Sequence, residues 1–183
     1  MAAATDVLSF HGVTASAYSV KGTNARHKRD DNDTADLEQP IMVPTELDPA
    51  GTTNYGWRKH TKINFTSTPT AQISNLVWYL DLLPEDTDPA RNWDGVSFYA
   101  GLKVSYTGGS ASDEAGMVSG LADADLIPYD AMTPMVVTSG VVLSNPSTGY
   151  GTQDYVVVQM SVNGLALPGE KDPRQSYYRW DEI

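Results

Sequence analysis

Hydrophobic and polar positions alternate with a period of two along the segment from Val96 to Thr107. The first set of alternate positions is apolar or aromatic and comprises Val96, Phe98, Ala100, Leu102, Val104 and Tyr106. The positions between them are mostly small or polar. Because successive side chains of a strand point to opposite faces, this pattern predicts a half-buried antiparallel strand. The pair Gly108-Gly109 predicts a turn or loop after it.

A second alternating segment runs from Tyr155 to Val162 and is followed by the turn dipeptide Asn163-Gly164. Its even positions are apolar and predict one buried face: Val156, Val158, Met160 and Val162. The opposite face carries Tyr155, Val157, Gln159 and Ser161. The period again indicates a strand, and Asn-Gly tolerates the positive φ angles of a tight turn.

The segment from Ala71 to Leu82 is apolar on both faces and predicts a central strand that is covered on both sides, or that is covered by a partner. Its two predicted faces are Ile73, Val77 and Tyr79 on one side, and Leu76, Trp78 and Leu80 on the other. The segment from Trp57 to Thr66 precedes it. The break at Ser67-Thr68-Pro69-Thr70 predicts that the two segments form a hairpin.

Weaker strand signals occur at Val7–Phe10, Val13–Val20, Ile41–Leu47, Met135–Leu143 and Ser176–Glu182. Many short strands separated by turn residues predict an all-β fold, an antiparallel β-sandwich of jelly-roll or Ig-like type with long loops. The length fits a single domain over residues 1–183. This domain is expected to carry an extended N-terminal loop at about 21–39, further polar loops at 84–95 and 108–125, and a C-terminal aromatic tail at about 174–183.

The amino-acid composition excludes several kinds of site and disfavours several classes of partner. The chain has no cysteine, which excludes disulfides, thiolate zinc sites and cysteine nucleophiles. The formal net charge of −11 disfavours nucleic acid and anionic membranes as partners. The first residues, Met1 to Asp6, lack the basic and apolar regions of a secretory signal.

Candidate metal and catalytic residues form no recognised motif. The histidines, His11, His27 and His60, have no metal-ligand spacing between them. Acidic clusters occur in two predicted loops, at Asp30, Asp31, Asp33 and Asp36 and again at Glu85, Asp86, Asp88 and Asp94. The first lacks the glycine that a calcium loop requires, and both are interpreted as solvated loops. We therefore predict no catalytic residues, no cofactor-binding residues, no metal site and no enzymatic activity.

Aromatic residues are the main candidates for binding. Trp78 is expected in the core, whereas Trp57, Trp93 and Trp180 are candidates for stacking on sugars. Near the C-terminus, three aromatic residues and an arginine have the composition of an interface hot spot. The predicted interface residues are Tyr177, Tyr178, Arg179 and Trp180. If this tail docks on a neighbour, truncating Tyr177 to Ile183 should weaken assembly more than folding.

The stretch Trp57-Arg58-Lys59-His60, followed by Gln72-Ile73-Ser74-Asn75-Leu76-Val77-Trp78-Tyr79, resembles tailed-bacteriophage virion proteins. The shared pattern is an aromatic and basic strand, a short break and Ile-Ser-Asn before an aromatic-rich strand. The resemblance covers about a quarter of the chain and implies an Ig-like or jelly-roll module that coats capsids or decorates tails. It carries no catalytic residues.

The leading hypothesis is a phage virion structural protein, a capsid decoration or cement protein that binds and stabilises the assembled head lattice. Its expected location is the virion, after assembly in the host cytoplasm. The expected partners are the major capsid protein or other virion proteins, and lattice symmetry favours a homo-oligomer such as a trimer. Two alternatives stay open: a tail, neck or baseplate component, and a carbohydrate-binding module.

Overall fold

A computed structural model describes residues 4–11, 17–20, 53–80, 94–106, 127–128, 134–166 and 176–182. These ranges hold ten β-strands: β1 (Thr5–His11), β2 (Ala17–Val20), β3 (Thr53–Tyr55), β4 (Lys59–Phe65), β5 (Gln72–Leu80), β6 (Val96–Lys103), β7 (Ile127–Pro128), β8 (Met135–Ser144), β9 (Tyr155–Asn163) and β10 (Ser176–Glu182). Every strand pair among them is antiparallel, which confirms the predicted all-β class. The predicted strand at 41–47, the loops at 21–39 and 108–125 and most of the loop at 84–95 lie outside the described residues.

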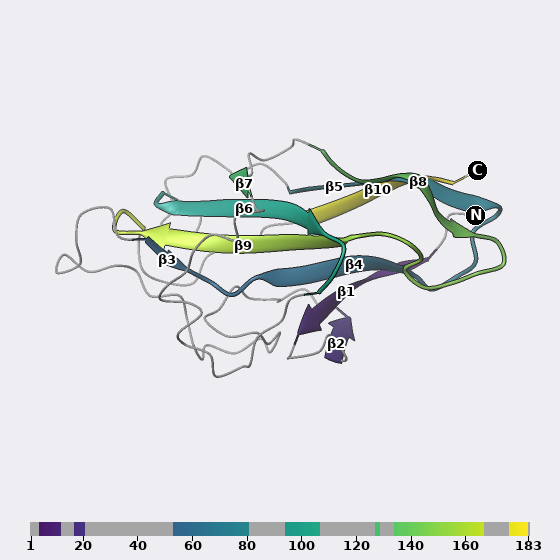
Figure 1. Cartoon of the computed structure of the whole chain (residues 1–183), viewed down its shortest axis with the longest axis horizontal. Helices are drawn as coiled ribbons and strands as arrows, with labels where there is room; N and C mark the ends of the chain where they lie inside the picture. The colour runs from purple at the N-terminus through teal and green to yellow at the C-terminus, as the bar shows by residue number, and fades with distance from the viewer. Residues whose placement is uncertain are drawn as a thin grey trace.

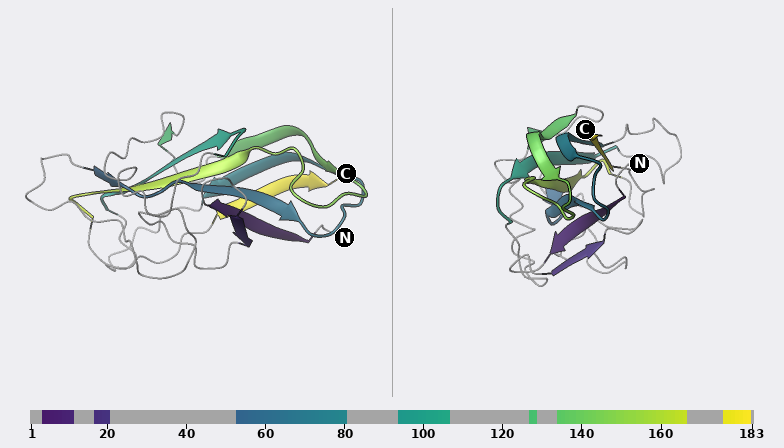
Figure 2. Two further views of the ribbon diagram at one scale, coloured as in Figure 1. Left: turned by 60° about the horizontal axis from the view of Figure 1, so that its bottom comes forward. Right: turned by 90° about the vertical axis from the view of Figure 1, so that its right-hand side faces the viewer.

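The described strands form two sheets (Figure 1). The large sheet has the order β2-β1-β4-β9-β6-β7, and β3 pairs with β9 beyond the end of β4. The small sheet has the order β10-β5-β8. Figure 1 shows the small sheet over one half of the long axis, while β3 and the far ends of β6 and β9 extend beyond it. In both views of Figure 2, β1 and β2 lie on the side of the molecule opposite β8.

An apolar core lies between the sheets. The large sheet contributes Ile63, Phe65, Phe98, Ala100, Val156 and Val158, and the small sheet contributes Ile73, Leu76, Trp78, Leu80, Val137, Val142 and Leu143. Burying such side chains contributes about 1.5–3 kcal/mol each, which makes this core the main source of stability. Two sheets that share one core form a β-sandwich. Its assignment as jelly-roll or Ig-like stays a prediction.

In β6 and β9, the alternate positions that were predicted to be buried are the ones that face the core. Phe98 and Ala100 of β6 and Val156 and Val158 of β9 all face the core. The prediction is wrong for the last positions of the first segment, because β6 ends at Lys103 and the chain bends at residues 104 and 105. Val104 is therefore 83% exposed, and Tyr106 joins residues on the opposite face of the large sheet.

The predicted hairpin between the segments at 57–66 and 71–82 is wrong. Strand β4 pairs with β1 and β9 in the large sheet, whereas β5 pairs with β10 and β8 in the small sheet. The connection at 66–71 therefore crosses between the two layers. Both β4 and β5 bury large apolar side chains against each other's sheet, and a flat hairpin could not place them on facing layers.

Strand β5 is the central strand of the small sheet, as predicted, but one of its faces was wrongly assigned. Asn75 has a φ of 51°, and the pairing of β5 with β8 shifts register on either side of it. This irregularity moves Ile73 to the same face as Leu76 and Trp78, where all three are buried in the core. The Asn75 side-chain Nδ2 donates a hydrogen bond to Asp181 Oδ2 at 2.6 Å, which ties the irregularity to β10.

Candidate functional site

The four residues of the predicted interface lie in β10, an outer strand of the small sheet as described. Because alternate residues of a strand point to opposite faces, the structure divides them into two pairs. Tyr178 and Trp180 pack against the core, and the Trp180 ring meets Phe65 edge-on with centroids 5.3 Å apart. Tyr177 and Arg179 lie on the outer face of the small sheet. Truncation from residue 177 would therefore remove part of the core and would test folding, not assembly.

The outer face of the small sheet carries a row of apolar and aromatic side chains, which we call the small-sheet patch. It comprises Val77, Tyr79, Val136, Tyr177 and Arg179. The Tyr79 and Tyr177 rings are stacked with centroids 5.2 Å apart and planes 19° apart. Val136 is 55% exposed and Tyr177 39% exposed, and Val77 lies buried beside them. The patch presents apolar surface flanked by one cation.

The tryptophans do not form exposed sugar platforms in the described part of the chain. Trp78 is buried in the core, as predicted. Trp57 is also buried, and its indole Nε1 has no hydrogen-bond partner among the described residues. Trp180 is half-buried against Phe65. Trp93 and the predicted acidic clusters, except Asp94, lie outside the described residues.

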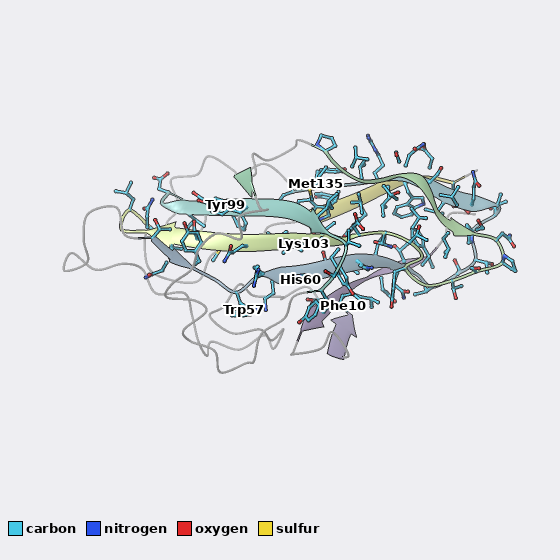
Figure 3. All side chains as sticks on the ribbon, in the orientation of Figure 1. Phe10, Trp57, His60, Tyr99, Lys103 and Met135 are labelled. Atoms are coloured by element: carbon cyan, nitrogen blue, oxygen red, sulfur yellow. The ribbon has the colours of Figure 1, made fainter. Side chains whose placement is uncertain are left out.

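A second cluster, which the sequence did not indicate, lies on the outer face of the large sheet. It comprises Phe10, His60, Lys62, Tyr106, Tyr150 and Tyr155, and we call it the Lys62 cluster. The pairing of β1 with β4 sets Phe10 opposite His60 on this face (Figure 3). The His60 and Tyr106 rings lie 4.8 Å apart, and the Phe10 and Tyr155 rings lie 5.1 Å apart at 89°.

Lys62 is the charged member of this cluster. Its side chain is 7% exposed, and its Nζ lies 4.1 Å from the Tyr155 ring centroid and 5.0 Å from that of Tyr150. Burial lowers the pKa of Lys62 below its ordinary value, and the negative charge of Asp154 partly offsets this effect. Burial likewise raises the pKa of Tyr155, with a further contribution from Tyr150. The cluster therefore places the ammonium group of a largely buried lysine against two aromatic rings.

The buried side chain of Gln153 positions the two tyrosines beside Lys62. Its Oε1 accepts a hydrogen bond from the Ile63 backbone N–H at 3.0 Å, and its Nε2 donates to the Ile63 carbonyl at 2.8 Å. The same Nε2 donates to the Tyr150 carbonyl at 2.6 Å. An amide side chain thus continues the ladder of β4 where β9 no longer pairs with it. It fixes the segment at 150–155 against β4.

Sequence reasoning missed the Lys62 cluster because its residues come from four separated parts of the chain. The segment His60-Thr61-Lys62 does place two basic residues at alternate positions of a strand, with Thr61 facing the core. That alternation could have indicated a polar or basic outer face. Nothing in the sequence indicated that Phe10 or Tyr150 would cover it.

The described residues hold neither a metal-ligand cluster nor a membrane-spanning helix. They contain no group of three or more His, Cys, Asp or Glu residues placed to hold a metal ion. Over the same ranges, no helix has the length and apolar character needed to cross a membrane. No protein-family model, no curated protein and no solved structure matches the chain.

Proposed function

We propose that the chain is a structural component of a tailed-bacteriophage virion, a capsid decoration protein that binds and stabilises the assembled head lattice. The observation that carries this proposal is the small-sheet patch. It offers exposed apolar area next to Tyr177 and Arg179, and tyrosine and arginine are enriched among interface hot spots. The resemblance of residues 57–60 and 72–79 to phage virion proteins supplies the choice of partner.

The size of the patch limits its role. Three strands about 4.8 Å apart and about nine residues long give the whole outer face of the small sheet roughly 400 Å², and the patch covers only part of that face. A stable interface buries about 800 Å² on each partner. The patch therefore serves as the centre of a contact with the major capsid protein, and surrounding residues complete the contact.

The proposed mechanism is mass action and requires no catalysis. A protein that binds only the assembled shell stabilises it by its binding free energy, about 2.7 kcal/mol per site at a free concentration 100 times Kd. Symmetric lattice positions favour a homo-oligomer, and we propose a trimer as its form. The location of the protein under this proposal is the virion.

The proposal can be tested by mixing the purified chain with undecorated capsids and measuring co-sedimentation and the temperature at which the shells break. We expect saturable binding and a raised disruption temperature. Substituting Tyr177→Ser together with Val136→Ser should weaken binding at least tenfold, because both side chains lie in the patch. Leu165→Ser is the matched control, since Leu165 is an exposed leucine in the turn after β9.

Absence of binding by the unsubstituted chain would overturn the proposal. Equal loss in the Leu165→Ser control would show that the patch is not the contact. An electron-microscopy map of a particle containing this chain gives an independent answer. Density on the tail, neck or baseplate would replace the decoration role.

A further inference from the structure

Arg179 differs from the other cations that the structure describes. The described ranges contain five lysine or arginine residues: Arg58, Lys59, Lys62, Lys103 and Arg179. Two of them are buried and two are half-buried, so that Arg179 is the only exposed one. The exposed cation of the described surface therefore lies in the small-sheet patch, on the same face of β10 as the exposed ring of Tyr177.

The charge of Arg179 is not matched on its own sheet face. Val77 is its register partner on β5, and Tyr177 precedes it by two residues. Asp181 follows by two residues, but its Oδ2 accepts the hydrogen bond from Asn75 Nδ2 at 2.6 Å. Among the described residues, no carboxylate forms an ion pair with Arg179. Because the side chain is exposed, solvent hydrates its guanidinium in the free protein.

Docking of a partner on the patch changes this hydration. A surface that covers the apolar side chains of the patch also removes water from Arg179, which lies among them. A cation that loses its water is stabilised only where an anion or several acceptors replace that water. A carboxylate fits best, because the guanidinium presents its N–H donors in a planar fork that a carboxylate accepts with both oxygens. A cation of the partner at this position is repelled.

We propose that Arg179 is the specificity-determining residue of the small-sheet patch and binds an aspartate or glutamate carboxylate set in an apolar surface of the major capsid protein. This role rests on the proposed decoration function and names what the capsid surface offers. Tyr177 and Val136 supply apolar area, and the ion pair at Arg179 fixes the position of the partner. The chain has a net charge of −11 and attracts cationic surfaces in general, so the local positive charge decides which surface fits the patch.

Charge variants of Arg179 test this role by co-sedimentation with undecorated capsids. We expect Arg179→Gln to weaken binding severalfold and Arg179→Glu to weaken it at least tenfold, because the second change sets two anions against each other. Lys103→Gln and Lys103→Glu are the matched controls, since Lys103 is a half-buried cation at the end of β6 in the large sheet. Both controls should leave binding nearly unchanged. Urea unfolding of each variant verifies that it folds.

Chemical cross-linking tests the carboxylate directly. Arg179→Lys keeps the positive charge and introduces an amine, which a carbodiimide joins to a contacting carboxylate as the reagent takes up water. With this variant bound to capsids, we expect a link between position 179 and an aspartate or glutamate of the capsid protein. Mass spectrometry of the digest identifies both residues. Arg179→Gln has no amine at this position and should give no such link.

The outcomes distinguish failure of this role from failure of the proposed function. Absence of capsid binding by the unsubstituted chain overturns both. If Tyr177→Ser with Val136→Ser weakens binding but Arg179→Glu does not, only the role of Arg179 is overturned. An equal loss in Lys103→Glu has the same consequence, because it would indicate an effect of net charge. A link from position 179 to Asp181, or to a second copy of the chain in place of the capsid protein, also overturns the role.

Discussion

The hydroxyl oxygens of Thr61 and Tyr178 lie 3.1 Å apart and join the large sheet to the small sheet through the core. The Thr61 hydroxyl also reaches the Val156 carbonyl at 3.3 Å and uses its single proton there. Tyr178 is then the donor to Thr61. This relationship explains why a tyrosine from the predicted interface points inward: its hydroxyl has a polar partner inside the sandwich.

Replacing Tyr178 by phenylalanine should remove this bond and little else. We expect the free energy of unfolding at neutral pH to fall by about 1 kcal/mol, the usual net value of one hydrogen bond. Urea unfolding measures it, and a double-mutant cycle with Thr61→Val isolates the pair. A coupling energy near zero would contradict the bond.

The same residue predicts a loss of stability in alkali. Burial raises the pKa of Tyr178 far above its unfolded value of 10.0, so the folded state favours the neutral phenol. The resulting stabilisation is complete below about pH 10 and decreases as the pH rises above it, because only the unfolded chain then releases the proton readily. Unfolding measured between about pH 9 and pH 11 should show a smaller decrease for Tyr178→Phe. An identical decrease in both proteins would refute the assignment.

Gln153 is expected to be among the most sensitive polar residues. Its side chain makes hydrogen bonds to Ile63 N–H, the Ile63 carbonyl and the Tyr150 carbonyl, and it is buried. Gln153→Ala leaves these groups without partners and should cost about 2–3 kcal/mol. Chemical unfolding gives the value. Thr152→Ala is a neighbouring control with a smaller expected cost, since Thr152 is exposed and its side chain makes one bond, to the Val141 carbonyl.

Asn75 should accept glycine more readily than alanine. Its φ of 51° lies in the left-handed region, where a non-glycine residue costs roughly 1–2 kcal/mol and asparagine is the best tolerated. We expect Asn75→Ala to be the less stable of the two variants by about 1 kcal/mol in thermal unfolding. Equal stability of the two would show that the loss of the bond to Asp181, which both share, is the only effect.

Two glycines in the connection between β8 and β9 form a matched pair. Both have positive φ angles, 108° at Gly149 and 57° at Gly151. A Cβ at Gly151 would lie 1.9 Å from the Val142 carbonyl oxygen, whereas a Cβ at Gly149 would meet nothing within 4 Å. Gly151→Ala should therefore lower the melting temperature more than Gly149→Ala. The reverse order would contradict the described packing of this connection against β8.

Local patterns predicted the strands well and their partners poorly. The alternation around Val156 and Phe98 arises because one face of each strand is buried. Since side chains of a strand alternate between its faces, this burial is visible in the local sequence as a period of two. Whether β4 pairs with β5 depends on which distant strands compete for each edge. Which face of β5 carries Ile73 depends on the positive φ angle at Asn75, and the presence of an asparagine only weakly predicts such an angle.

The same distinction applies to the candidate sites. The composition of residues 177–180 indicated an interface, and only the alternation of β10 in its sheet separates Tyr177 from Tyr178. The Lys62 cluster required knowledge that β1, β4 and the segment at 150–155 meet. Residues such as Phe10 and Tyr150 are 140 positions apart in the chain, and no spacing rule relates them.

The crossing of residues 66–71 from one layer to the other has a consequence for biosynthesis. It delivers β5 to a sheet whose other strands, β8 and β10, are translated much later. Until residue 182 has left the ribosome, Leu76 and Trp78 lack the complete small sheet that shields them in the folded protein. Pairing across such long separations is slow, and unpaired apolar strands aggregate. The core face of β5 therefore stays incompletely covered during synthesis until β10, the last strand of its sheet, has been made.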